Sequence, residues 1–333
     1  MNLYFSTASV PSIWAAFVGN IDRYEGVADP KAIASNAVLE EVLVAVAKTT
    51  ATSPQVWHCN RQVVLDKTYD VFTRPSSVTE YGLQDLYREM YEATSGFAKA
   101  QGGVLFTARM TDIIVDGELR DGFLLVKYGS GRIGIKGNDA STMKMEQVAT
   151  TDDIDYTALF LDIEDDQGPL VLISDFRSKK SETRTMWRDA FLQLEPAHDS
   201  YFYTCNLIEA VKAAIDAVPG KIEKMNLRYA VSNFLKDEEE FEFQYFCSTV
   251  GLDEANLGDM ITLQGGNVPQ NFTISPNAVK ASATALKTTI KLDRNFSISA
   301  NCRPGLRPGL VERGFDEKKG KNYYKLYFDA EKD

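Results

Sequence analysis

The residues best suited to chemistry are cations that follow a predicted strand. Arg177, Lys179 and Lys180 come directly after an apolar run, and Arg184 lies in the first turns of the amphipathic segment that follows. Free backbone N–H groups at a helix start, together with cationic side chains, favour a bound phosphate. The strand-to-helix turn is therefore a predicted phosphate contact, with charge balance on a solvated surface as the alternative.

A second set of cations lies in two loops near the end of the chain. Tyr323 and Tyr324 stand beside the second of these loops. Loops that carry Arg, Lys and aromatic residues are typical of contacts with a nucleic-acid backbone, although ordinary surface loops also carry cations. The predicted contacts here are Arg303, Arg307, Lys318, Lys319 and Lys321.

A group of acidic residues offers a different chemistry, that of a metal-dependent nuclease. Asp162 and Glu164 follow one predicted strand, and Asp175 follows the next. Carboxylates at strand ends can hold Mg²⁺, and a nearby cation can stabilise the charge that develops on a phosphate. The expected pattern ends in acidic-x-Lys, whereas Arg177 stands where the Lys would be. An acidic, solvated loop is the preferred interpretation, and a divergent nuclease is kept as the alternative.

No complete catalytic set stands out elsewhere in the sequence. Gly129–Gly134 matches the dinucleotide fingerprint, but strand-like residues follow it where the fingerprint requires a helix. The two histidines, His58 and His198, are far apart in the sequence, and the four cysteines are too widely spread for a metal knuckle or a redox pair. We therefore predict no catalytic residues, no metal and no cofactor; enzymatic activity stays open, with a non-enzymatic protein favoured.

A central sheet must position these residues. Four apolar runs of strand length, each bounded by Gly, Asp or Pro, are typical of buried strands. The amphipathic segment after Ser181 places Trp187 and Phe191 on one helical face. These elements predict an α+β fold with a central, mostly antiparallel sheet, packed helices, a helical segment and a small β-rich C-terminal module. The four runs are 104–107, 123–126, 158–161 and 170–173.

Helices are predicted before and after this sheet, because apolar residues recur there at three- and four-residue steps. Trp14 belongs to a predicted short helix, and Asp29-Pro30 is a predicted helix start. Alternating apolar residues near the end of the chain predict two hairpins. The longer predicted helices cover 29–48, 77–91, 206–217, 221–235 and 238–249, and the hairpin strands cover 286–292, 296–300, 310–315 and 323–328.

Composition and charge divide the chain further. The net charge is −11 over 333 residues, yet residues 278–328 carry eleven Lys or Arg against four Asp or Glu. A phosphate responds to charge within about a Debye length, so this local excess matters more than the net charge.

The sequence shows no recognisable signal peptide and no membrane-spanning segment. We therefore predict a cytoplasmic protein. The predicted domains are 1–100 (mixed, largely helical), 101–263 (sheet-and-helix core with a helical extension) and 278–333 (basic, β-rich).

The order of segments between residues 102 and 218 resembles the bacterial 37-kDa nucleoid-associated protein family (NdpA-like), of which this chain would be a divergent member. The resemblance is carried by Gly102–Phe106, the run 123–126, the acidic stretch ending in Asp155-Tyr156, and the strand, basic turn and helix of 170–194. It implies a nucleoid-located protein that binds double-stranded DNA, as a dimer, without a known enzymatic reaction. The family's basic turn corresponds to Arg177, Lys179, Lys180 and Arg184.

The sequence and the resemblance together predict a nucleoid-associated protein that binds double-stranded DNA through phosphate contacts, largely independently of base sequence. The alternatives are the divergent metal-dependent nuclease and a protein-interaction module, related to phage defence, that uses its acidic face. The predicted partners are double-stranded DNA, a second copy in a homodimer and a protein at the acidic face, with no membrane.

Overall fold

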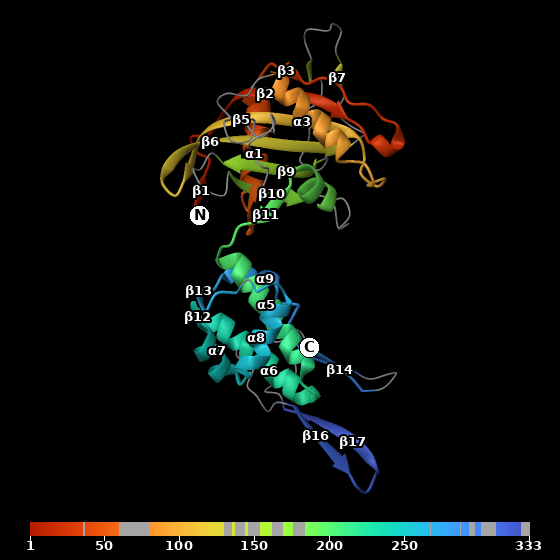
Figure 1. Cartoon of the computed structure of the whole chain (residues 1–333), viewed down its shortest axis with the longest axis vertical. Coiled ribbons are helices and arrows are strands. Elements are labelled where there is room, and N and C mark those ends of the chain that lie inside the picture. Colours follow the sequence, from red (N-terminus) through yellow and green to blue (C-terminus); the bar gives the residue numbers. More distant parts are fainter. Residues whose placement is uncertain are drawn as a thin grey trace. The chain divides into compact units, whose positions relative to one another are not determined.

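The computed structural model divides the chain into two compact units, unit 1 (Met1–Ala197) and unit 2 (His198–Asp333) (Figure 1). The residues that the structure describes are 1–35, 37–59, 80–129, 135–136, 144–145, 154–161, 169–175, 184–266, 268–286, 288–292, 297–300 and 311–327. The candidate contacts Arg177, Lys179, Lys180, Arg303 and Arg307 and the nuclease candidates Asp162 and Glu164 lie outside the described residues.

A nine-stranded sheet forms the centre of unit 1 (Figure 1). Its order is β11-β4-β10-β9-β6-β5-β2-β3, with β1 beside β5, and the pairings between its described strands are antiparallel. The α+β fold with a central antiparallel sheet is thereby confirmed. The strands are β1 (Leu3–Tyr4), β2 (Ser9–Val18), β3 (Lys31–Ile33), β4 (Val56–Cys59), β5 (Gly103–Val115), β6 (Glu118–Gly129), β9 (Ile154–Leu161), β10 (Leu170–Asp175) and β11 (Leu194–Pro196).

Helices cover both faces of this sheet. On β5, Val104 and Phe106 belong to the core cluster that includes α1 (Ala37–Thr50), whereas Leu105 belongs to the cluster that includes α3 (Glu80–Glu92). A strand buried on both faces has apolar residues at successive positions instead of alternating ones. This explains why the four predicted runs were recognisable as continuous apolar segments.

The N-terminal segment differs from the prediction. The helix predicted around Trp14 is wrong, because Ser9–Val18 form β2, which pairs with β5. Ile13 faces the α1 cluster and Val18 faces the α3 cluster, so the apolar spacing that resembles a helix arises from burial on two sides. Pairing with a distant strand has overridden the local pattern.

The next predicted helix also begins later than expected. Residues Lys31–Ile33 form the edge strand β3, and α1 starts at Ala37. Residues 1–100 thus contribute β2, β3 and β4 to the same sheet as the later strands, and the two core clusters of unit 1 draw on residues from both sides of position 100. The division into compact units falls at Ala197, away from the predicted domain limits.

The helix predicted after the basic turn is present in its described part. Arg184 and Thr185 are helical, and the segment continues as a π-helix over Met186–Phe191. Trp187 is buried and stacks on Tyr156, with ring centroids 5.5 Å apart. Smaller elements of unit 1 are the 3₁₀ turn Ile21–Arg23 and the strand pair β7 (Ile135–Lys136) and β8 (Lys144–Met145).

Unit 2 consists of a helical core with three two-stranded sheets. The predicted helices 206–217 and 221–235 correspond to α5 and α6, while 238–249 divides into a short strand followed by a helix. Its helices are α5 (Ser200–Ala217), α6 (Lys221–Asp237), α7 (Phe243–Val250), α8 (Glu254–Leu263) and α9 (Pro276–Ala281). Its strands pair as β12 (Glu240–Glu242) with β13 (Asn271–Thr273), β14 (Thr288–Lys291) with β15 (Ser297–Ala300), and β16 (Val311–Asp316) with β17 (Lys321–Leu326).

The two hairpins predicted at the end of the chain are confirmed as β14–β15 and β16–β17. They are joined to the helices through a small core in which Met225 and Tyr229 of α6 pack with Ile290 and Val311. The basic end of the chain therefore shares apolar contacts with α6.

Candidate nucleic-acid interface

Hairpin β16–β17 brings together three of the predicted contacts. Lys318 and Lys319 lie in its turn, and Lys321 is the first residue of β17. The register runs from Val311 opposite Leu326 to Asp316 opposite Lys321. The sequence grouping of these lysines therefore corresponds to a spatial grouping at the end of one hairpin.

Asp316 organises the turn. Its Oδ1 accepts hydrogen bonds from the backbone N–H groups of Lys318 and Lys319, at 3.0 and 3.1 Å. Gly320 completes the turn with a φ of 61°, a conformation that glycine adopts without steric cost. Lys319 Nζ lies 4.0 Å from Asp316 Oδ2 and its side chain is 78% exposed, so this contact neutralises little of its charge. The turn is ordered while its ammonium groups face solvent.

The hairpin as a whole is cationic and exposed. Residues 311–327 carry five Lys or Arg against three Asp or Glu. Two aromatic side chains near its end are open to solvent, Phe315 at 58% and Tyr323 at 49%. Cations interleaved with exposed aromatic rings suit a polyanion that also carries flat bases.

Lys325 adds a further cation on the same strand. The Tyr327 hydroxyl donates to Glu312 Oε2 at 3.0 Å, and Lys325 Nζ lies 4.5 Å from the centroid of the Tyr327 ring. The hydrogen bond with Tyr327 is the main cause that raises the pKa of Lys325, so this fully exposed group is charged at neutral pH.

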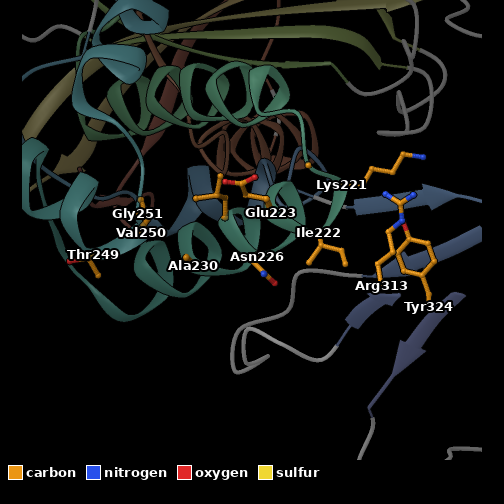
Figure 2. Close-up of a pocket in the computed structure, with 12 residues that line it drawn as sticks. Lys221, Ile222, Glu223, Asn226, Ala230, Thr249, Val250, Gly251, Arg313 and Tyr324 are labelled. Carbon is orange, nitrogen blue, oxygen red and sulfur yellow. The ribbon is translucent and has the colours of Figure 1, made fainter. Parts of the chain in front are cut away.

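The face of the hairpin that carries Arg313 and Tyr324 borders a groove of about 640 Å³ (Figure 2). In an antiparallel pair, opposed residues share a face, so Arg313 lies beside Tyr324 on the same face as Val311, which packs on α6. Figure 2 shows Lys221, Arg313 and Tyr324 toward one end of the groove and the segment Thr249–Gly251 toward the other. Between them, α6 contributes Ile222, Glu223, Asn226, Leu227 and Ala230.

Sequence reasoning missed this groove. The start of α6 after Pro219-Gly220 and the hairpin strands were each recognised, but nothing in the sequence shows that they adjoin. The adjacency depends on Val311 meeting Met225 and Tyr229, a contact between residues far apart in the chain. Tyr324 was noted only as an aromatic residue beside a basic loop, and Arg313 only as one of the cations of the basic module.

Arg184, the remaining described candidate, belongs to unit 1 and is engaged in an ion pair. Its Nε and Nη2 both lie 3.3 Å from Asp175 Oδ2. The Arg184 side chain is 54% exposed, whereas that of Asp175 is only 13% exposed. The carboxylate offsets part of the positive charge that a phosphate would meet at Arg184. Arg184 belongs to unit 1, whereas the hairpin lysines belong to unit 2.

The nuclease alternative gains no geometric support. Asp175, its one described carboxylate, is the partner of Arg184. Within the described ranges, no group of three or more His, Cys, Asp or Glu side chains could hold a metal ion. His58 is buried in β4, and the ring of His198 stacks on Phe202 with centroids 4.7 Å apart.

No protein-family model and no curated protein matches this sequence. Among the helices described, none combines the length and apolarity needed to cross a membrane.

Proposed function

We propose that this protein binds nucleic acid, double-stranded DNA foremost, through phosphate contacts made by hairpin β16–β17. The observation that carries the proposal is the exposed, ordered hairpin end, where Lys318, Lys319 and Lys321 gather without an equal number of anions. The resemblance noted in the sequence supports the same function, and with it a nucleoid location in the cytoplasm and a homodimer.

The shape of the hairpin suits a duplex. The major groove of B-DNA admits a two-stranded ribbon, and its rims are lined with phosphates. Lysine binds phosphate as a point charge on a flexible stem, which fixes neither a base nor a bidentate geometry. Binding through Lys318, Lys319 and Lys321 is therefore largely independent of base sequence.

A salt titration tests the proposal. A labelled blunt-ended duplex is titrated with the full chain by fluorescence anisotropy at several salt concentrations between about 50 and 200 mM, where log affinity falls by about 0.9 per phosphate contact for each unit of log salt. Lys318→Ala with Lys319→Ala is expected to weaken binding and to flatten this slope by up to about 1.8.

The matched control removes the same charge elsewhere in unit 2. Lys236 and Lys280 lie outside the hairpin and are exposed, so Lys236→Ala with Lys280→Ala changes the net charge equally. If the control pair weakens binding as much as the hairpin pair, the effect is one of net charge, and the hairpin is not the contact surface. An affinity independent of salt would exclude phosphate contacts altogether.

A further inference from the structure

The groove beside the hairpin is lined by apolar, aromatic and charged residues. Contact with a phosphate would involve only the charged ones. The groove's lining includes apolar side chains of α6, Ile222, Leu227 and Ala230, and the aromatic side chain of Tyr324. Its volume of about 640 Å³ falls within the range of about 300–1,000 Å³ in which small-molecule sites lie. A groove lined by an aromatic ring and apolar side chains suits a flat ring system, and hence a base.

One residue of the groove lining has a buried polar atom without a partner. Asn226 Oδ1 is buried, and among the described residues it has no hydrogen-bond partner. Buried acceptors in native proteins are nearly always satisfied, by protein, water or ligand. A side-chain amide presents an acceptor and a donor together, the combination with which Asn pairs to the edge of a base.

The two cations of the groove lie next to the aromatic wall. Arg313 stands opposite Tyr324 in the hairpin register and forms no ion pair with a described residue, and Lys221 is the first residue of α6 (Figure 2). Glu223, the one carboxylate among the residues that line the groove, lies in the first turn of α6. A ligand with one phosphate group therefore fits the Arg313–Lys221 end, and like-charge repulsion keeps that phosphate away from Glu223.

We propose that this groove binds one unpaired nucleotide. The base lies on the Tyr324 ring with its edge hydrogen-bonded to the Asn226 amide, and the phosphate contacts Arg313 and Lys221. This inference rests on the proposed function and deepens it, because a base inside a duplex is stacked and cannot enter the groove. The protein would accordingly prefer DNA that offers an unpaired nucleotide at an overhang or a gap, and a free nucleotide has the same chemistry.

Three probes separate the sources of the nucleotide. The full chain is titrated with a blunt duplex, with the same duplex carrying a short single-stranded overhang, and with a free deoxynucleoside monophosphate. The overhang is expected to raise affinity about tenfold, the lower part of the range for stacking one base on an aromatic side chain. Tyr324→Leu is expected to remove this gain while binding to the blunt duplex persists, and Arg313→Gln, which also removes one of the hairpin's cations, is expected to reduce the gain.

Asn226→Leu adds a readout that a purely structural role would not produce. Removing a buried, unpartnered acceptor is expected to raise the melting temperature of the free protein, while the gain from the overhang is lost. Asn256→Leu, on α8 outside the groove, is the matched control: it shows how much of the change in melting temperature comes from helix propensity, and it should leave the gain from the overhang unchanged. Loss of folding would not explain these results, because Arg313 is exposed and Asn226→Leu is not expected to destabilise the fold.

The outcomes separate the two proposals. Equal affinity for blunt and overhanging duplexes, with no binding of the monophosphate, overturns the groove assignment and leaves the hairpin proposal standing. A preference for overhangs that persists in Tyr324→Leu and Asn226→Leu also overturns it. Binding of the monophosphate alone, lost in Tyr324→Leu, supports the groove as a site for free nucleotides while the hairpin proposal fails.

Discussion

Lys127 offers the sharpest test of the energetics of unit 1. It lies on β6 between β5 and β9, its side chain is buried, and its Nζ donates to the carbonyl oxygens of Tyr128 and Gln101 at 3.1 and 3.3 Å. Desolvation by burial lowers the pKa of Lys127 to about 8, although the carboxylates of Asp155 and Glu25 favour the charged form. The ordinary lysine value is 10.5.

The sign of the pH dependence follows from proton binding. Between a native pKa of about 8 and an unfolded value near 10.5, the unfolded chain binds more protons than the native one. The free energy of unfolding therefore rises with pH across this window, by up to about 3 kcal/mol from this group. Between about pH 7 and 9.5, a range accessible to experiment, the rise is about 2 kcal/mol.

The perturbation is Lys127→Met, which keeps the length of the side chain and removes the titrating group. Urea unfolding is followed by tryptophan fluorescence, because Trp14, Trp57 and Trp187 are the only tryptophans and all lie in unit 1. The unfolding free energy of the wild type minus that of the variant is expected to increase by about 2 kcal/mol between about pH 7 and 9.5.

Other titrating groups contribute equally to both proteins and cancel in this difference. Lys48→Met, at an exposed position of α1, controls for the loss of a lysine charge. A difference between wild type and Lys127→Met that stays flat or falls with pH would refute the reasoning. It would mean that the native state solvates the ammonium group, or that Asp155 and Glu25 offset the cost of its burial.

Two further outcomes are expected. Gly103→Ala should lower the free energy of unfolding by about 1–3 kcal/mol in urea titrations, because the added Cβ would overlap the Tyr128 carbonyl oxygen and approach Lys127 Nζ to 2.6 Å. Labelled duplex incubated with Mg²⁺ or Mn²⁺ should remain intact on a denaturing gel, whereas cleavage that Asp162→Ala abolishes in a folded protein would replace the binding proposal with the nuclease.

Much of the fold was accessible from local patterns. The strands β5, β6, β9 and β10 were found because burial on both faces leaves an unbroken apolar run bounded by turn residues. Hairpin β16–β17 was found because its turn carries charged residues and a glycine that the backbone requires with positive φ. These signals lie within a few residues of the structure they specify.

The misses have a common physical cause, dependence on distant partners. The spacing of apolar residues in β2 is compatible with a helix as well as with a strand. The segment is a strand because it pairs with β5. In α8 only Leu257 is fully buried, and Met260 and Ile261 are partly buried, so its apolar face is short and was missed. The groove likewise requires Val311 to dock on α6, which no local pattern encodes.

The distribution of charge along the chain bears on the proposed binding by a short cationic hairpin. The whole chain carries −11, whereas residues 311–327 carry five cations against three anions. At the ionic strength of the cell the Debye length is about 8 Å. Charges farther than this from a phosphate at the hairpin end are largely screened from it. At about 0.01 M salt the length grows to about 30 Å, and the repulsion from the rest of the chain reaches the same phosphate. Lowering the salt thus strengthens attraction and repulsion together. In the proposed function, the acidic chain would limit non-specific coating of DNA and favour orientations in which the hairpin makes the contact.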